Sequence, residues 1–318
     1  EFPFTCTLGF SEVYGMVHPA KHDRAEEPDL CVIILNSGMT HRVGPHRLAV
    51  RLARRLVDIG IPAARFDFSG IGNSDARKDG KSIKEQWISQ CREVMELLAK
   101  EYGYRRFVMF GLCAGGQAAF SFATNDERVV GAILLNTRDY ELDNNWERYA
   151  SMERNARFYI RKAPLRKSTW KRLLTGKSSL KNISQAVAFQ LKGMFRSNKT
   201  LKHAQNWFAD QLSKILNRNS CILFLFSKGD PGLDQLRLLI GKEAMDRYSS
   251  EKGDGQIKIQ LIYNADHTFT MRQTQEDVLE LIVLWMAGFE KLYRSTQTKA
   301  TLDSASNAGS EMDRADVV

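Results

Sequence analysis

The chain has 318 residues and a formal net charge of +9, and 43% of its residues are hydrophobic while 26% are charged. This length and composition are typical of a globular protein with a sizeable buried core. The longest apolar runs, at 221–226 and 281–289, fall well short of the roughly 20 residues that a transmembrane helix needs. We therefore expect no membrane span, and no secretory signal opens the printed sequence.

Cysteine usage indicates a reducing compartment. The cysteines are odd in number, widely scattered and mostly embedded in apolar periodic segments: Cys6, Cys31, Cys91, Cys113 and Cys221. This pattern argues against a disulfide framework, and we predict a cytoplasmic location. No CxxC pair occurs, so we predict no bound metal.

Predicted strands and helices alternate along most of the chain. In chain order they are strands at 3–9, 12–18 and 30–36, a helix at 44–60, a strand at 61–68, a helix at 82–103, a strand at 105–110, a helix at 114–125 and a strand at 128–136. The alternation resumes with a strand at 221–226, a helix ending near 248, a strand at 256–263 and a helix at 273–294. Such alternation predicts an α/β fold with a mostly parallel, doubly wound sheet.

Between these two parts the alternation lapses, and residues 138–216 show helical patterns without a strand. We predict an inserted all-helical cap there, a core formed by 1–137 and 217–296, and a disordered tail at 297–318. Between Glu147 and Lys202 the cap has 15 Lys and Arg against 2 Glu, which exceeds the net charge of the whole chain. This basic stretch is either a solvated helical surface or a surface for acidic partners, such as the phosphates of coenzyme A, an acidic acyl carrier protein or anionic lipid. No nucleic-acid-binding motif accompanies it, so we expect no nucleic acid partner.

The segment FVMFGLCAGGQAAF (107–120) runs from a strand directly into a helix, with Cys113 at the turn and glycines at 111 and 115. Small residues two positions either side of a turn residue are typical of the strained G-x-S-x-G elbow, which exposes a nucleophile above the edge of a sheet. Here the nucleophile position holds cysteine. The alternative is an inert elbow with a spare thiol.

Two late loops carry the remaining candidates. Strand 221–226 is followed by SKGDPGLD, which offers Asp230 and, as a rival, Asp234. Strand 256–263 is followed by NADHTFT, which contains His267.

With these motifs in the order nucleophile, acid, histidine, the core resembles the α/β-hydrolase superfamily. The resemblance implies a catalytic triad of Cys113, His267 and Asp230, with backbone N–H groups of Met39 and Ala114 as oxyanion donors. The elbow with cysteine is similar to those of dienelactone hydrolases and polyhydroxyalkanoate synthases. The whole chain looks like capped hydrolases associated with polysaccharide-export or natural-product gene clusters.

Two further stretches support this resemblance. LNSGMTHRVGP (35–45) matches the loop after the third strand that supplies one oxyanion donor. FDFSGIGNSD (66–75) looks like the family's D-x-x-G-x-G-x-S turn, and we interpret it as structural. It completes neither GxGxxG nor a Walker sequence, so we predict no nucleotide cofactor.

We expect an acyl-transfer enzyme that forms a thioester acyl-enzyme on Cys113 and takes acyl groups from a thioester, on coenzyme A or a carrier protein, or from an activated ester. The acceptor is a second substrate or water. One alternative is an ester or lactone hydrolase of the dienelactone-hydrolase type. Another is a non-catalytic binding protein that docks an acidic partner through the basic cap. The sequence does not predict an oligomeric state.

Overall fold

The computed structural model describes residues 1–8, 11–20, 29–76, 80, 82–138, 140, 201–250 and 255–289. Most of the predicted cap, over 141–200, and the predicted disordered tail lie outside the described residues. The division of the chain into core, cap and tail therefore stays a prediction.

The core is one eight-stranded sheet with the order β1-β2-β4-β3-β5-β6-β7-β8. The strands are β1 (Phe2–Leu8), β2 (Ser11–His18), β3 (Leu30–Ile34), β4 (Ala63–Phe66), β5 (Arg106–Leu112), β6 (Val129–Leu135), β7 (Cys221–Ser227) and β8 (Ile257–Ile262). β2 is antiparallel to both β1 and β4, and every pair from β4 to β8 is parallel. The predicted mostly parallel sheet is confirmed, and the carboxyl ends of its parallel strands meet at one edge.

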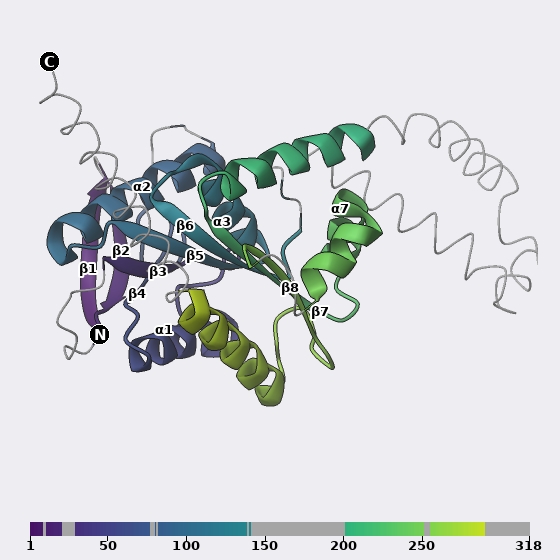
Figure 1. Ribbon diagram of the computed structural model, residues 1–318. Helices are drawn as coiled ribbons and strands as arrows, with labels where there is room; N and C mark the ends of the chain where they lie inside the picture. The colour runs from purple at the N-terminus through teal and green to yellow at the C-terminus, as the bar shows by residue number, and fades with distance from the viewer. Residues whose placement is uncertain are drawn as a thin grey trace, which may run out of the picture.

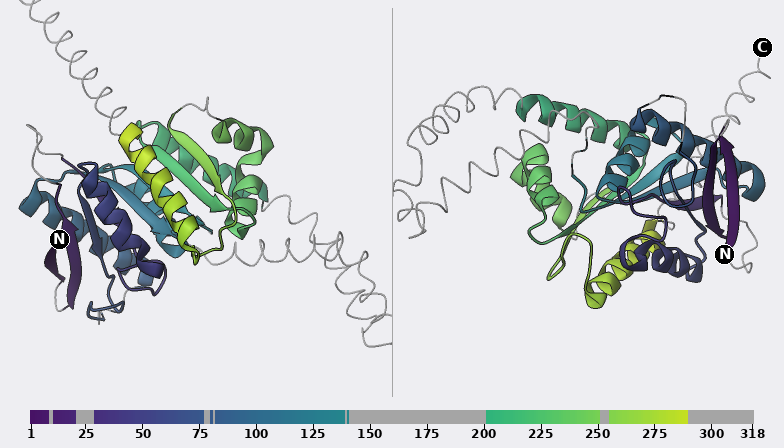
Figure 2. Two further views of the ribbon diagram at one scale, coloured as in Figure 1. Left: turned by 90° about the horizontal axis from the view of Figure 1, so that it is seen from below. Right: turned by 180° about the vertical axis from the view of Figure 1, so that it is seen from behind.

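Helices cover both faces of the sheet, as expected for a doubly wound fold (Figure 1). The labelled helices are the short 3-10 helix η1 (Pro45–Arg47), α1 (Leu48–Asp58), α2 (Ile83–Tyr102), α3 (Ala114–Asn125) and α7 (Pro231–Ser249), and residues 201–216 and 272–289 are also helical. α2, α3 and helix 201–216 lie over one face, while α1 and helix 272–289 lie over the other (Figure 2).

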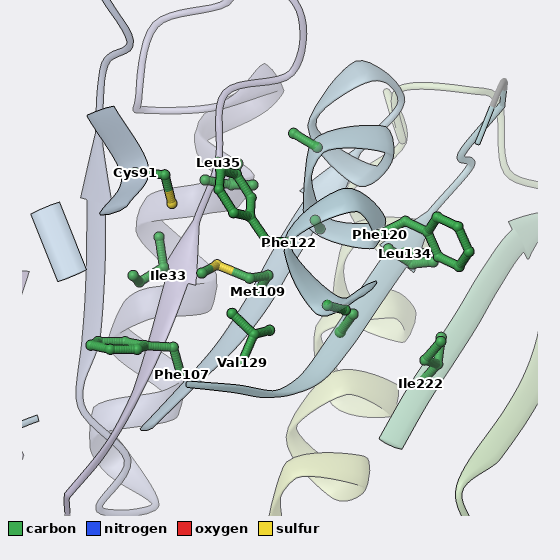
Figure 3. Packing of buried hydrophobic residues seen from close by; sticks show 14 of the residues in the cluster. Ile33, Leu35, Cys91, Phe107, Met109, Phe120, Phe122, Val129, Leu134 and Ile222 are labelled. Carbon is green, nitrogen blue, oxygen red and sulfur yellow. The ribbon is translucent and has the colours of Figure 1, made fainter. Parts of the chain in front are cut away.

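The two faces are packed by alternate residues of the same strands. In β5, Phe107 and Met109 point into the cluster under α2 and α3, and Val108 and Phe110 point into the cluster under α1 and helix 272–289. Figure 3 shows the first cluster, with Cys91 of α2 over side chains of β3 and β5. Because these strands are buried on both faces, they appear in the sequence as unbroken apolar runs.

Helix ends follow local chemistry where the sequence provides it. α2 begins at a capping box, in which the Ser82 side chain accepts from the N–H of Glu85 and the Glu85 side chain accepts from the N–H of Ser82. The helix ends at Gly103, which has the left-handed conformation. The helix predicted at 44–60 begins later, at Leu48. Positive φ angles at His46 and Arg47, just before that residue, interrupt the helical backbone.

Residues 201–216, which the sequence prediction assigns to the end of the cap, form a helix that packs on the core. Phe208 is fully buried and stacks on Phe120 of α3, with ring centroids 5.3 Å apart. Tyr140 completes the contact, since its ring lies 4.9 Å from that of Phe208. This helix thus covers the sheet beside α3.

Candidate active site

The turn between β5 and α3 is a tight elbow with Cys113 at its tip. Cys113 has φ 56° and ψ −116°, a strained conformation for a residue with a side chain. A methyl group added at Gly111 would lie 2.0 Å from the carbonyl carbon of Gly115, and one at Gly115 would lie 2.5 Å from the backbone oxygen of Asn36. Only glycine allows the strand, the helix and the neighbouring loop to approach this closely. The glycine spacing seen in the sequence therefore builds the elbow.

His267 and Asp230 meet at the same edge of the sheet. Nδ1 of His267 lies 2.6 Å from Oδ2 of Asp230, which is 5% exposed. The other carboxylate oxygen, Oδ1, accepts from the N–H of Gly232 at 2.8 Å and caps α7. Asp234, the rival acid, is instead exposed and pairs with Arg237. The structure thus places Asp230, and not Asp234, against the histidine.

The Cys113 thiol and the His267 side chain interact electrostatically, and this interaction joins the elbow to the pair. This interaction, together with one between the thiol and Arg138, lowers the pKa of Cys113 below that of an ordinary thiol, although burial opposes the shift. The bond to Asp230 and then the interaction with Cys113 raise the pKa of His267 to about 9. Both shifts favour a thiolate beside an imidazolium.

The other four cysteines differ from Cys113 in chemistry as well as in place. All four are buried, whereas Cys113 is partly exposed. Burial raises the pKa of Cys6 and of Cys221 to about 11 and raises the pKa values of Cys31 and Cys91 further. Cys113 is therefore the thiol suited to nucleophilic attack.

The loop that carries His267 is held in place from β6 and β7. The Asn136 side chain donates to Oγ of Ser227 and to the backbone oxygen of His267, both at 2.9 Å, and accepts from the N–H of Ser227 at 2.7 Å. Oγ of Ser227 in turn donates to the backbone oxygen of Asp266. Asn136 is fully buried and has φ 46°. It fixes the height of the histidine loop above the sheet.

The loop after β3 lies directly against the elbow. Oγ of Ser37 donates to the backbone oxygen of Leu112, the residue before Cys113, at 3.1 Å. The N–H of Thr40 donates to the backbone oxygen of Ser37 and closes a turn. The N–H of Met39 lies within this turn and takes no part in that hydrogen bond. On the helix side, the first N–H groups of α3, including that of Ala114, have no intrahelical acceptor, and the Cys113 side chain does not cap them.

Asp67 ties the loop after β3 to the loop after β4. The carboxylate is fully buried and accepts from Nδ2 of Asn36 at 3.0 Å, from the backbone N–H and guanidinium of Arg42, and from the N–H of Asn73 at 3.4 Å. Its pairing with Arg42 compensates the burial of the charge. The turn interpreted as structural in the sequence thus anchors the predicted oxyanion loop.

Sequence reasoning missed two residues of this site, Asn136 and Arg138. Both follow β6 directly, at the edge where the site lies. The position of polar residues immediately after a buried parallel strand was an available signal. These polar residues lie near Cys113 because β6 lies between β5 and β7 in the sheet.

Comparison with known families identifies the fold. The sequence profile of the family described as serine aminopeptidase, S33 (Hydrolase_4) matches residues 27–185, half of the chain. The chain belongs to this α/β-hydrolase family. The predicted superfamily is therefore confirmed. No curated protein matches the chain in sequence.

Solved structures share this α/β-hydrolase fold at low sequence identity. A proline iminopeptidase from Mycobacterium smegmatis is 13% identical with a TM-score of 0.53, covering 90% of this chain and 98% of that one. A serine hydrolase without a lid from Xanthomonas campestris is 10% identical with a TM-score of 0.51, covering 91% and 94%. A thermophilic esterase from Thermogutta terrifontis is 16% identical with a TM-score of 0.50, covering 91% and 99%. Identities this low show the fold and not the substrate.

Two other kinds of site are absent from the described residues. None of their helices combines the length and the apolar character that crossing a bilayer requires. In the same part of the chain, no group of three or more His, Cys, Asp or Glu is arranged to hold a metal ion.

Proposed function

We propose that this α/β-hydrolase transfers acyl groups through a thioester formed on Cys113. The observation that carries the proposal is the buried Asp230 carboxylate bonded to His267, which in turn interacts with a cysteine held at a strained elbow. A buried carboxylate that orients a histidine, which in turn contacts a nucleophile, is the arrangement that activates serine and cysteine in acyl-transfer enzymes.

The reaction follows from the positions of these groups. The Cys113 thiolate attacks the acyl carbonyl, a carbon–sulfur bond forms, and backbone N–H groups of Met39 and Ala114 stabilise the oxyanion by about 3–4 kcal/mol each. The leaving group departs with a proton from the His267 imidazolium. An acceptor or water then attacks the thioester and gives its proton to His267, and the thiolate is released.

A thiol nucleophile favours thioester donors. An acyl group on Cys113 is close in energy to one on coenzyme A or on a carrier phosphopantetheine, so loading from these donors is nearly thermoneutral. The basic stretch within 147–202 suits the phosphates of coenzyme A or an acidic carrier protein. A free nucleophilic thiol also suits the reducing cytoplasm.

Hydrolysis of esters or lactones is the second candidate and uses the same residues. Hydrolysis is favoured because the chain belongs to a hydrolase family and because an esterase has the same fold. The two functions differ only in whether an acceptor or water attacks the thioester. A non-catalytic binding protein, in contrast, would retain its function without Cys113.

Intact-mass measurement after incubation with a panel of acyl-coenzyme A, acyl-carrier thioesters and p-nitrophenyl esters tests the proposal. We expect one acyl adduct on the wild type and on Cys6→Ala, which removes a buried thiol, and none on Cys113→Ala. Product analysis with and without amine or alcohol acceptors then separates transfer from hydrolysis. Failure of every donor to load the wild type, or loading of Cys113→Ala, contradicts the proposal.

A further inference from the structure

The histidine loop, residues 263–271, has a second set of contacts, made by the helix that follows it. Nε2 of Gln275, in helix 272–289, donates to the backbone oxygen of Phe269 at 2.7 Å and to that of Thr270 at 3.3 Å. Gln275 is 5% exposed, so these bonds are shielded from water. A buried amide thus fixes the carbonyl groups just after the imidazole.

These contacts complement those from the neighbouring strands. The backbone oxygens of Asp266 and His267 accept from the side chains of Ser227 and Asn136, at the ends of β7 and β6. The carbonyl groups on both sides of the imidazole are therefore held by side chains from outside the loop. The strands hold the first part of the loop, and Gln275 holds the part after His267.

The backbone turns sharply at Phe269, two residues after His267. Phe269 has φ 59°, a conformation that is costly for a residue with a bulky side chain. Its ring is fully buried in the cluster under α1, together with Val278 and Leu279. A strained backbone persists only where its surroundings impose it. The buried ring and the two bonds from Gln275 are the contacts that impose it here.

Arg51 of α1 sets the orientation of the Gln275 amide. A guanidinium group can only donate, and Nη1 of Arg51 donates to Oε1 of Gln275. The amide oxygen therefore faces α1, and the amide nitrogen faces the loop. Arg51 also donates to Glu276, which pairs with Arg55 as well. Because α1 and helix 272–289 lie over the same face of the sheet (Figure 2), the amide links the histidine loop to α1.

The position of this loop determines the geometry of the proposed triad. Nδ1 of His267 lies 2.6 Å from the buried carboxylate of Asp230, and the interaction of the imidazole with Cys113 lowers the pKa of the thiol. A histidine side chain has only two rotatable bonds, so both contacts depend on where its backbone lies. A shift of about 1 Å in a reacting group can cost about a hundredfold in rate.

We propose that Gln275 is a positioning residue, which sets His267 against Cys113 by fixing the carbonyl groups of the turn after the imidazole. Arg51 supports this role because it orients the amide. The inference relies on the proposed function for the part that His267 plays. It extends the active site to a contact between two helices, α1 and helix 272–289.

The pH dependence of Cys113 alkylation by iodoacetamide tests the proposal without turnover. Gln275→Met keeps the length of the side chain and removes the amide, so we expect the inflection to move to higher pH, towards that of His267→Gln. The double variant with both substitutions should have the inflection of His267→Gln alone, because a positioning residue has no effect without the group that it positions. A residue that only stabilises the fold would not move the inflection in the single variant.

Gln256→Met is the matched control. Nε2 of Gln256 also donates to two backbone oxygens, those of Leu216 and Ser220, at 3.2 and 3.4 Å. This glutamine precedes β8, whereas His267 follows it. Gln256→Met should therefore lower the stability and leave the inflection of Cys113 where it is in the wild type.

Two variants of Arg51 test the orientation of the amide. Arg51→Met removes the donor to Gln275, while Glu276 keeps its pair with Arg55, and Arg51→Lys keeps a donor. With a p-nitrophenyl ester we expect Gln275→Met to slow acylation about tenfold, the equivalent of about one or two hydrogen bonds between neutral groups. Arg51→Met should slow acylation by less, and Arg51→Lys should recover most of that loss.

An unchanged inflection in Gln275→Met overturns the proposal, and so does a further shift when Gln275→Met is added to His267→Gln. If Gln275→Met does not fold, the same alkylation measurement on Arg51→Met decides, and an inflection equal to that of the wild type overturns the proposal. If the inflection depends on Gln275 as expected but no donor acylates Cys113, the positioning role stands and the acyl-transfer proposal fails.

Discussion

Replacing Asp230 with asparagine separates the two contacts of this carboxylate. Oδ1 caps α7 through the N–H of Gly232, and Oδ2 binds Nδ1 of His267 at 2.6 Å. Asparagine caps helices about as well as aspartate, so Asp230→Asn should keep the helix start. Asp230→Ala removes the cap as well, which costs about 1 kcal/mol of the free energy of unfolding.

The loss in rate follows from the contact with the histidine. A buried hydrogen bond to a charged group contributes about 1.5–3 kcal/mol, and each 1.36 kcal/mol is a factor of ten in rate. We therefore expect Asp230→Asn to slow acylation of Cys113 by about 10- to 160-fold. The loss is larger if the amide donates to Nδ1, because His267 then holds its proton on Nε2 and cannot accept one from the thiol.

Stopped-flow release of p-nitrophenol gives the acylation rate, and thermal unfolding gives the stability of the same samples. The prediction is a large loss of rate in both variants, with a loss of stability that is larger by about 1 kcal/mol in Asp230→Ala, because that variant lacks the helix cap as well. An Asp230→Asn variant that acylates at the wild-type rate would refute the reasoning. So would equal destabilisation of the two variants, because the helix cap would then not depend on a side-chain acceptor.

Three further predictions concern the elbow, the thiol and the histidine loop. In chemical denaturation, Gly111→Ala should lower the free energy of unfolding by about 3 kcal/mol or more, since the new methyl would meet backbone atoms at 2.0–2.3 Å. The control Gly288→Ala, in open space on a helix, should be neutral or stabilising by up to about 1 kcal/mol. Equal effects of the two substitutions would contradict this prediction. In the wild type, iodoacetamide should alkylate Cys113 at a lower pH than an ordinary thiol requires, because the pKa of Cys113 is lowered chiefly by His267. In His267→Gln the inflection should move to higher pH, because burial, which raises the thiol pKa, remains. An unmoved inflection would exclude the imidazole as its cause. Asn136→Ala should lose about 2–4 kcal/mol of unfolding free energy and most of the acylation rate, because it removes the bonds to the histidine loop. Asn136→Gly should recover only the part of the unfolding free energy that is due to the positive φ angle. Full recovery of the acylation rate in Asn136→Gly would show that the hydrogen bonds do not position the histidine.

The sheet and the elbow could be predicted because their signals are local. Buried parallel strands appear as apolar runs, and the elbow requires glycine at 111 and 115 whatever surrounds it. The order of the late loops placed Asp230 and His267 at the same edge, and the structure brings them into contact. The start of α1 was harder, since the positive φ angle at Arg47 has no signature in its residue type.

Arg138 and Asn136 could not be assigned from the sequence for a different reason. The partner of Asn136 lies far along the chain, since its bond to the backbone oxygen of His267 spans 131 residues. Only the strand order, with β6 between β5 and β7, brings the residues after β6 beside the nucleophile and the histidine. The same applies to Asp67, whose turn motif predicts a structural loop but not its attachment to Arg42.

The central claim is that the sulfur of Cys113 carries the acyl group, and the chemistry of the adduct tests it most directly. Neutral hydroxylamine cleaves thioesters and leaves ordinary esters largely intact. After loading with a radiolabelled acyl donor, the label on the wild type should map to the peptide containing Cys113 and be released by neutral hydroxylamine. Label on Cys113→Ser should map to the same peptide and resist release. A wild-type label that resists hydroxylamine, or that maps elsewhere, would contradict the account.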